Sequence, residues 1–413
     1  MRTAGAVHRL TTAVPYRWHL VAALSITETI SWGIVYYGFP VFLQPMEQSL
    51  GASRVGVTGA FSLALAVSSV AALPVGRWLD RYGPRALMTA GSCLATVLLW
   101  AWSRVTSLGA LYLVWGLMGL AMAAILYEPA FAAIVQWFPR HRDRALLAVT
   151  LAAGLASTIF MPLAAWLLGR IGWRLAVQVL GGFLALTTIP VHAAVLRPPP
   201  RSPESSRAPA GPRSARAPLA GVLATPAFWA LAGAFTVGIF STVTVSVHLI
   251  PFLTQQGYPP TSAAAVVGWI GAMQIPGRLL FVPATAWASS HVVAGILFLL
   301  QACAMVLLPM ATSPPRLILV TMLLGATNGM ATLVRATIVA ELFGRERYAT
   351  ISGAIAVGVN GARALGPVGA SLLRLWLGGY GNVFRVLSVA LAVVGVALLG
   401  VLRRGRPEQR SAR

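Results

Sequence analysis

Five charged side chains lie well inside long apolar stretches of the sequence, away from their ends. Two are acids, Glu28 and Glu128, and three are arginines: Arg278, Arg335 and Arg363. A charge near the middle of a bilayer is costly, so an ionisable residue in such a segment indicates a functional site. Guanidinium groups present planar donors that suit a carboxylate, and burial lets a carboxyl group hold a proton near neutral pH. The pattern predicts an anion site and a proton-transfer group within apolar helices.

Polar and aromatic residues recur at helical spacing beside these five, which places them on shared helix faces. Glu28, Trp32 and Tyr36 follow one another at four-residue intervals, and Tyr127 adjoins Glu128. Similar pairs in the second half are Gln274 with Arg278, Asn328 with Arg335, and Asn360 with Arg363. We expect substrate to be bound by Arg278, Gln274, Arg335, Arg363, Asn328, Asn360, Trp32, Tyr36 and Tyr127, and protons to be carried by Glu28 or Glu128. A structural role, as a helix tie or packing bridge, stays open for each charged residue.

The composition identifies the elements that must hold these residues as membrane helices. Of the 413 residues, 57% are hydrophobic and 10% are charged, and the mean hydropathy is +0.77. A soluble domain carries about 25% charged residues. All 31 basic residues are arginines, which excludes P-loop, Schiff-base and kinase-type lysine chemistry. The two cysteines lie in apolar runs and form no disulfide or zinc pattern.

The apolar runs predict an all-α membrane protein with twelve transmembrane helices in two pseudo-symmetric six-helix bundles. The spans are expected near 18–42, 55–76, 86–104, 109–137, 145–168, 174–196, 226–252, 262–286, 292–312, 317–343, 350–373 and 383–402. The bundles would occupy 1–196 and 223–402, and a basic tail 403–413. A linker rich in Pro, Ser, Ala and Arg covers 197–222. Trp100, Trp102, Trp137, Trp166 and Tyr380 fit an aromatic belt at the membrane interfaces.

Arginines are divided unequally between the two sides of the predicted membrane. The N-terminal and C-terminal tails and the even-numbered loops hold 21 arginines, whereas the other loops hold seven. By the positive-inside rule both termini are cytoplasmic. The same bias accounts for the net charge of +22 without nucleic acid. Arginine without lysine suggests a GC-rich bacterial genome, and hence the bacterial cytoplasmic (inner) membrane.

The two halves of the chain contain an internal repeat. The segment Phe138-Pro139-Arg140-His141-Arg142 recurs at an offset of 205 as Phe343-Gly344-Arg345-Glu346-Arg347. Pro162 and Pro367 are separated by the same offset. Duplicated halves are typical of secondary transporters.

A loop motif after the second predicted helix resembles that of the major facilitator superfamily. The segment Gly76–Arg85 fits the superfamily pattern G-x-x-x-D-[RK]-x-G-[RK]-[RK], except that Pro84 stands where a basic residue is usual. Gly83 permits a tight turn. We expect Asp80 to lie among Arg77, Arg81 and Arg85 in a charge network. The resemblance implies that Asp80 also approaches the start of the eleventh helix, and that Gly76, Arg77, Asp80, Arg81, Gly83 and Arg85 form a conformational latch.

Finer features are similar to the monocarboxylate and oxalate:formate branch of that superfamily. They are Trp32-Gly33 followed by Tyr36-Tyr37, then Tyr127-Glu128-Pro129, Gly172-Trp173-Arg174, and the pair Gln274 and Arg278. In monocarboxylate transporters an Asp and an Arg occupy such a pair; here Gln274 replaces the acid. The resemblance implies a secondary carrier that moves a small organic anion by alternating access, with or without a coupled proton.

Other functions are less consistent with the sequence. An exporter of a neutral or amphipathic molecule is the main alternative, and a membrane sensor on the same scaffold is a remote one. An enzyme is not expected, because no H-E-x-x-H or G-x-S-x-G motif and no His/Cys/Asp metal cluster occurs. We expect a monomer in membrane lipid whose partner is a small molecule, a carboxylate, with no cofactor, metal or nucleic acid.

Overall fold

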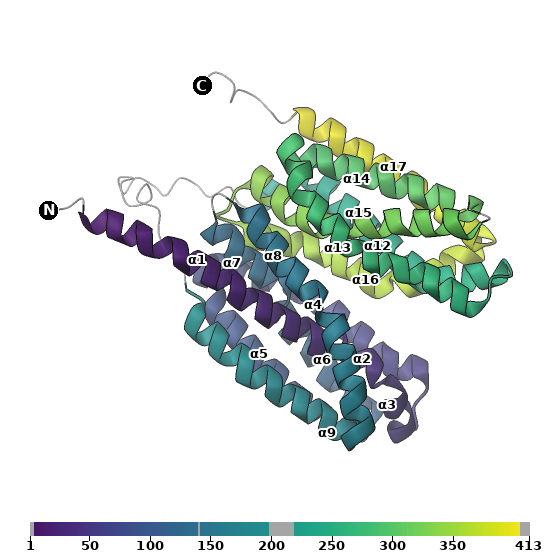
Figure 1. Cartoon of the computed structure of the whole chain (residues 1–413), viewed down its shortest axis with the longest axis horizontal. Coiled ribbons are helices and arrows are strands. Elements are labelled where there is room, and N and C mark those ends of the chain that lie inside the picture. The colour runs from purple at the N-terminus through teal and green to yellow at the C-terminus, as the bar shows by residue number, and fades with distance from the viewer. Residues whose placement is uncertain (1–3, 139–140, 198–218, 312, 405–413) are drawn as a thin grey trace. The chain divides into compact units, whose positions relative to one another are not determined.

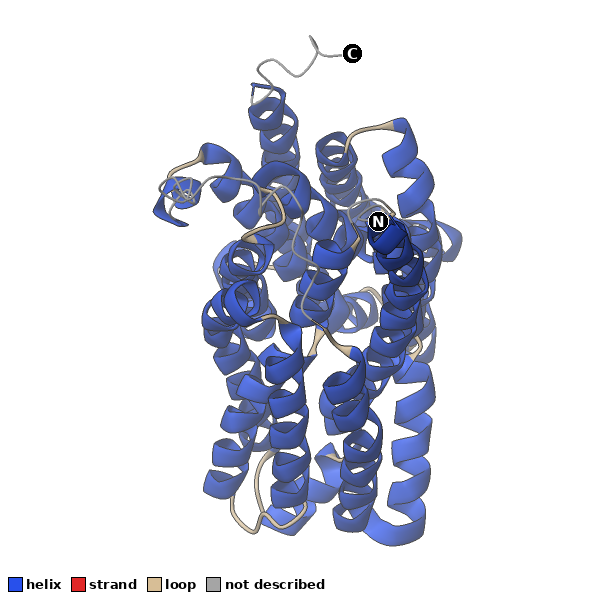
Figure 2. Ribbon diagram, turned by 90° about the vertical axis from the view of Figure 1, so that its left-hand side faces the viewer, coloured by secondary structure: helices blue, strands red, loops and turns tan. Residues whose placement is uncertain are grey.

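The computed structural model describes residues 4–138, 141–197, 219–311 and 313–404. Within them every regular element is a helix, and the ribbon shows no strand (Figure 2). The all-helical prediction is therefore confirmed. Most of the predicted linker at 197–222 and of the predicted tail at 403–413 lies outside the described residues.

The chain forms two compact units. The first comprises Met1–Arg207 and Gly344–Val357, and the second comprises Ala208–Phe343 and Gly358–Arg413. The first unit thus takes in the start of the eleventh predicted crossing. Helices of each unit are labelled in Figure 1.

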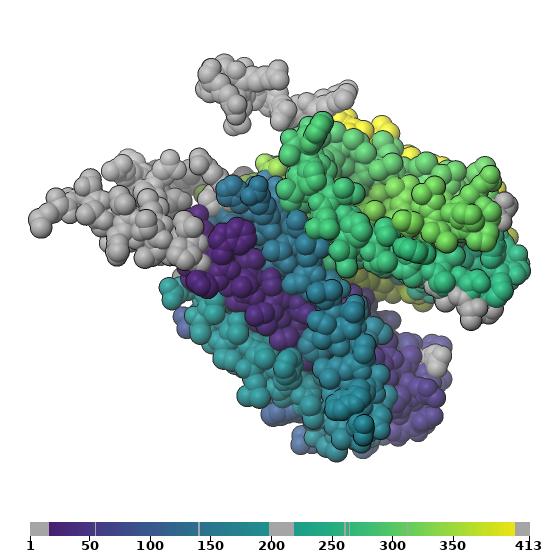
Figure 3. Space-filling model, viewed as in Figure 1, coloured from purple at the N-terminus to yellow at the C-terminus, as the bar shows by residue number. Residues whose placement is uncertain are grey.

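The described helices of the first unit follow the first six predicted crossings. They are α1 (Ala4–Ser31), the π turn η1 (Trp32–Tyr36), α2 (Gly38–Val41), α3 (Leu43–Leu50), α4 (Arg54–Tyr82), α5 (Pro84–Trp102), α6 (Leu108–Ile125), α7 (Tyr127–Trp137), α8 (Arg142–Gly154) and α9 (Ala156–Val195). On the surface of this unit, α1 lies beside α8 and α9 (Figure 3).

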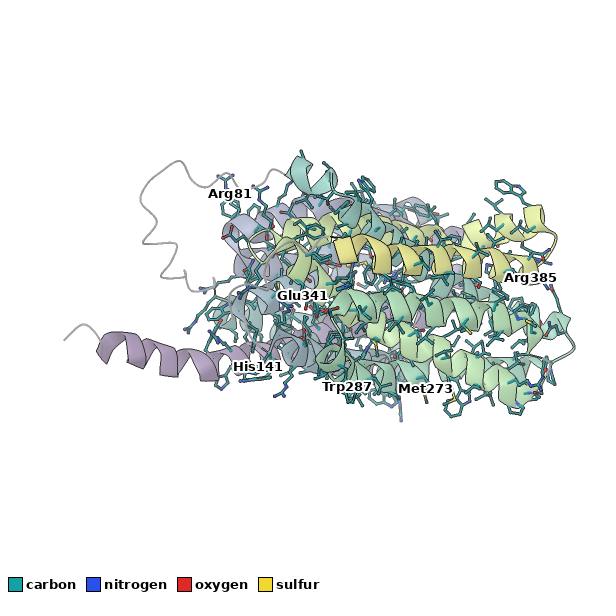
Figure 4. The ribbon with its side chains drawn as sticks, turned by 90° about the horizontal axis from the view of Figure 1, so that it is seen from above. Arg81, His141, Met273, Trp287, Glu341 and Arg385 are labelled. Carbon is teal, nitrogen blue, oxygen red and sulfur yellow. The ribbon has the colours of Figure 1, made fainter. Side chains whose placement is uncertain are left out.

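The described helices of the second unit follow the remaining crossings. They are α11 (Leu219–Leu223), α12 (Pro226–Gln255), α13 (Pro260–Trp287), α14 (Ser290–Leu307), the 3-10 turn η2 (Leu308–Met310), α15 (Pro314–Phe343), α16 (Tyr348–Leu377) and α17 (Tyr380–Arg404). Arg385 lies at the opposite end of this unit from Glu341, as expected for helices that run its full length (Figure 4).

Ten described helical segments are long and apolar enough to cross a membrane. One of them, Arg142–Val195, has 54 residues and holds two predicted spans. They are separated at Gly172, whose φ of 74° favours glycine. Adding α16, which is outside the ten, the described helices account for the twelve predicted crossings.

Three predicted spans are less regular than the sequence suggested. The first is interrupted by the π turn η1, and α8 and α9 are separated by Leu155. The span at 109–137 is broken at Leu126, whose ψ of −165° is not helical. Pro129 explains this break, because it has no N–H and its ring would clash with the carbonyl of Ile125.

The same helix pairing occurs inside each unit. Helix α4 packs on α6 and α5 on α9, and correspondingly α13 packs on α15 and α14 on α17. Glycines allow the first type of pair to approach closely. A Cβ atom at Gly119 would overlap the carbonyl of Ala64, and one at Gly329 would overlap the carbonyl of Gln274.

The outer surfaces carry large apolar side chains, as lipid-facing surfaces do. Trp287, labelled in Figure 4, is 92% exposed. Each unit also exposes one cysteine, Cys93 in α5 and Cys303 in α14. The predicted aromatic belt is partly wrong, because Trp102, Trp137 and Tyr380 are only 1%, 8% and 6% exposed. All three rings belong to the interior of their units.

Candidate functional site

A cluster of rings surrounds the first predicted carboxylate in the first unit. The indole Nε1–H of Trp32 donates to Oε2 of Glu28 at 3.1 Å. The Trp32 ring lies 5.0 Å from that of Tyr36 and 4.9 Å from that of Tyr127, measured between centroids. Tyr127 in turn stacks on Phe131. The structure therefore brings together four of the residues that the sequence placed at a site.

The π turn adds a fifth residue that the sequence analysis missed. The N–H of Tyr37 donates to the carbonyl of Trp32 at 2.9 Å, an i to i+5 bond. This wider turn brings Tyr37 toward the side that carries Trp32, and their ring centroids lie 6.3 Å apart. In a regular α-helix the two residues would point about 140° apart. The ring cluster is Trp32, Tyr36, Tyr37 and Tyr127.

Glu128 occupies a different environment from Glu28. It lies in the first turn of α7, just after the break at Leu126, and its side chain is half-buried. The hydroxyl of Ser352, in α16, donates to its Oε2 at 2.7 Å. Glu28 is 0% exposed. Of the two acids, Glu128 is therefore the accessible one.

The loop motif contacts α16 through Asp80 and Gly76. Asp80 accepts the N–H groups of Ala349 and Thr350 at 3.1 and 2.7 Å. These are among the free donors of a helix N-terminus, where a carboxylate is favourable. A Cβ atom at Gly76 would overlap the carbonyl of Ala349, so this position requires glycine. Gly83 turns the chain with a φ of 79°.

The expected charge network around Asp80 is not present. In the described residues Asp80 forms no ion pair with Arg77, Arg81 or Arg85, which are exposed. The guanidinium of Arg81 lies instead over the ring of Tyr82, 5.1 Å from its centroid. These arginines are solvated, whereas the carboxylate of Asp80 faces the helix start. Arg81 and His141 both lie at the end of the first unit that carries this motif (Figure 4).

Three helices of the second unit carry the remaining predicted site residues. On α13, Arg278 is 7% exposed and Gln274 is half-buried one turn before it. On α16, Arg363 donates to Oδ1 of Asn360 at 3.0 Å. On α15, Arg335 is half-buried and lies seven residues after Asn328. Each of the three predicted pairs therefore lies on a helix, and each pair includes one arginine.

Two further polar residues of this unit lie outside the predicted set of site residues. Oγ1 of Thr242 in α12 lies 3.4 Å from Oδ1 of Asn328. His248 bonds the hydroxyl of Tyr380 and the carbonyl of Pro367, each at 3.1 Å. The carbonyl oxygen of Pro367 can only accept a hydrogen bond, so the neutral His248 ring carries its proton on Nε2, which faces that oxygen. For Thr242 and His248, the only signal in the sequence is that a polar residue lies in an apolar run.

A model of the Major Facilitator Superfamily matches residues 24–315. The chain belongs to this superfamily. It is an integral, multi-pass membrane protein and a transporter. The resemblance that the loop motif and the branch features suggested is confirmed.

Similar proteins include transporters of small organic acids. Monocarboxylate transporter 13 of Bos taurus is 29% identical over 339 residues, which cover 79% of this chain and 75% of that protein. The oxalate:formate antiporter of Oxalobacter formigenes is 27% identical over 237 residues, covering 57% of this chain and 55% of the antiporter. The second match therefore spans only about half of either protein.

Two solved structures have the same fold. The human organic anion transporter MFSD10 (TETRAN) matches with a TM-score of 0.70 at 13% identity, covering 92% of this chain and 99% of that one. The fucose:proton symporter FucP of E. coli matches with a TM-score of 0.74 at 13% identity, covering 92% and 98%. At this identity the likeness concerns the fold alone.

Proposed function

We propose that the transporter carries a small organic anion of the monocarboxylate type by alternating access. The observation that carries this proposal is Arg278, a buried guanidinium in a membrane helix, with the amide of Gln274 one turn away. A guanidinium removed from bulk water binds a carboxylate strongly and in a defined orientation. The names of the monocarboxylate transporter and the oxalate:formate antiporter support the same substrate class.

Uptake into proteoliposomes tests the anion assignment. Labelled monocarboxylates and dicarboxylates are offered to the wild type, to Arg278→Gln and to Arg316→Gln. Arg316 is exposed at the start of α15, so its variant controls for the loss of one positive charge. We expect saturable uptake whose KM rises about 10- to 100-fold in Arg278→Gln, because a charged hydrogen bond is lost, and is unchanged in Arg316→Gln.

Two results would contradict the proposal. If the folded wild type carries no carboxylate, the substrate class is wrong, and neutral or amphipathic molecules, including export, are tested next. If both arginine variants change KM equally, Arg278 has no specific role in anion binding. Counter-exchange of labelled for unlabelled substrate separates a carrier from a channel.

We propose further that Glu128, rather than Glu28, carries the coupled proton. Glu128 is half-buried and accepts the hydroxyl of Ser352, whereas Glu28 is fully buried and accepts the indole N–H of Trp32. A group that exchanges protons with water must be reachable. Glu128→Gln is expected to abolish stimulation by an inward proton gradient while counter-exchange persists, and Glu28→Gln is expected to retain it. The reverse pattern would assign the proton to Glu28.

A further inference from the structure

We infer that the ring cluster selects substrates whose carboxylate is attached to a flat aromatic body, and that Glu28 is a positioning residue for this cluster. The inference rests on the proposed function, since it names the class of organic anion. All the residues that support it belong to the first unit.

The four rings lie next to one another and are only partly covered by the packing of the core. Trp32, Tyr36, Tyr37 and Tyr127 are all half-buried, whereas the neighbouring positions Gly33, Ile34 and Val35 are buried. The cluster is supported from behind, because Tyr36 packs edge-on against Phe61 at 5.3 Å between centroids. Part of each ring surface therefore remains open to a bound molecule.

A polar residue adjoins the cluster, which distinguishes the cluster from a purely lipid-facing surface. Tyr127 is followed directly by Glu128, which is also half-buried and hydrogen-bonded to Ser352. A carboxyl group exposed to hydrocarbon is costly, so the partial exposure of Glu128 indicates a water-accessible path beside Tyr127. Aromatic rings beside such a path meet the substrate rather than acyl chains.

Glu28 fixes the orientation of the central ring. Its carboxylate lies one helical turn before Trp32, is 0% exposed and accepts the indole N–H. A buried indole N–H requires a partner, and this bond restricts rotation of the side chain. Because Glu28 is fully covered, a substrate touches the ring and not the carboxylate. Its effect on binding must pass through Trp32.

Two carboxylates of similar size can distinguish recognition of an aromatic ring from recognition of size alone. Benzoate and cyclohexanecarboxylate carry the same charged group on six-membered rings, but only benzoate is flat and has π faces. Aromatic pairs gain stability beyond their buried area through offset or edge-on contact. We expect the wild type to favour benzoate by about 2- to 10-fold in KM.

Variants of Trp32 test where this preference arises. Trp32→Leu is expected to bring the two KM values together, mainly by raising that of benzoate. Trp32→Phe keeps a ring but loses the hydrogen bond to Glu28, so it should retain part of the preference, and Tyr127→Leu is a second variant if Trp32→Leu does not fold. Trp166→Leu removes an exposed ring of the same unit and should change nothing.

The role of Glu28 is tested by the same ratio of KM values. Glu28→Gln keeps a carbonyl acceptor for the indole and should preserve the preference, whereas Glu28→Leu removes the acceptor and should lower it in the Trp32 background but not in Trp32→Phe. A residue with a merely structural role would reduce uptake of both substrates equally in both backgrounds.

The possible outcomes distinguish a failure of the aromatic selectivity from a failure of the organic-anion function. Equal KM values in a wild type that carries both substrates, or equal losses for both in Trp32→Leu and Tyr127→Leu, would overturn the aromatic selectivity and leave the organic-anion function standing. Uptake of neither carboxylate by folded protein would remove the proposed function and the inference with it.

Discussion

Asp80 shows how one side chain ties two distant segments of the chain together. It is 269 residues from Ala349 in sequence, yet its carboxylate accepts both N–H groups at the start of α16. Each bond is charge-assisted and lies at the positive end of a helix dipole. The predicted latch would open when these two bonds break and free the first turn of α16.

Asp80→Asn is expected to loosen the first turn of α16. The amide keeps one acceptor oxygen but loses the charge, at a cost of about 1 to 2 kcal/mol, or a factor of about 5 to 30. Hydrogen exchange of the backbone around Ala349 and Thr350 should accelerate by that factor. Asp143→Asn is the matched control, because Asp143 is also a half-buried carboxylate in the first turn of a helix, α8, but pairs with the neighbouring Arg142 rather than with a distant segment. Unchanged protection in Asp80→Asn would contradict the latch.

The sequence predicts which side chains share a face of one helix, but it does not predict which side chains meet across the fold. The interval of four residues correctly joined Glu28 to Trp32, and the motif resemblance pointed Asp80 to the eleventh helix. Ser352 is 224 residues from Glu128, so no local pattern could have linked them. Tyr37 was missed because regular helical geometry places it on another face than Trp32.

Helices α4 and α16 approach each other through a reciprocal pair of glycines. A Cβ atom at Gly76 would overlap the carbonyl of Ala349, and one at Gly353 would overlap the carbonyl of Ala72. The hydroxyl of Ser69 in α4 also reaches the carbonyl of Val357. Backbones this close gain dispersion contacts but leave no room for a methyl group.

Gly76→Ala and Gly353→Ala are each expected to destabilise this helix pair by about 1 to 3 kcal/mol through overpacking. Thermal unfolding of the purified protein in detergent measures the effect as a lower Tm. Gly182→Ala is the control, because Gly182 is a helical glycine in α9 with open space at its Cβ position. There the change should be neutral or slightly stabilising. Equal melting of all three variants would show that the contact does not form.

The positions of the helices could be predicted from the sequence, but the breaks inside them could be predicted only in part. Apolar length located every crossing, and Gly172 marked the turn between two of them. Pro129 could have indicated the break at Leu126, because proline disfavours the turn before it. The π turn η1 has no comparable local signal, since it depends on how its rings pack with Tyr127 and Phe61.

The arginine distribution predicts the orientation of the whole molecule, and an epitope-tag experiment tests it. A tag at the C-terminus should be detected only in permeabilised cells. A tag inserted between Thr106 and Ser107, which are exposed between α5 and α6, should be detected on intact cells. Detection of the C-terminal tag on intact cells would reverse the predicted orientation. The predicted monomer and bacterial inner membrane stay predictions.

The helices could be predicted from composition because hydrocarbon restricts a chain to few structures, whereas the superfamily was predicted from the resemblance of one loop motif. Every backbone polar group must be paired within a segment, so apolar length translates almost directly into helices. The substrate is less predictable, since it depends on a few side chains whose partners are decided by tertiary contacts. Arg278 illustrates the limit: its burial was expected, but no sequence pattern names the ligand.

The two cysteines give the native chain a use that requires no redesign. Cys93 and Cys303 are exposed, and each belongs to a different unit. Nitroxide labels attached to both thiols would report the separation of the units as a distance distribution by pulsed electron paramagnetic resonance. A distribution that shifts when a carboxylate is added would record the transport cycle in a protein whose sequence has not been altered.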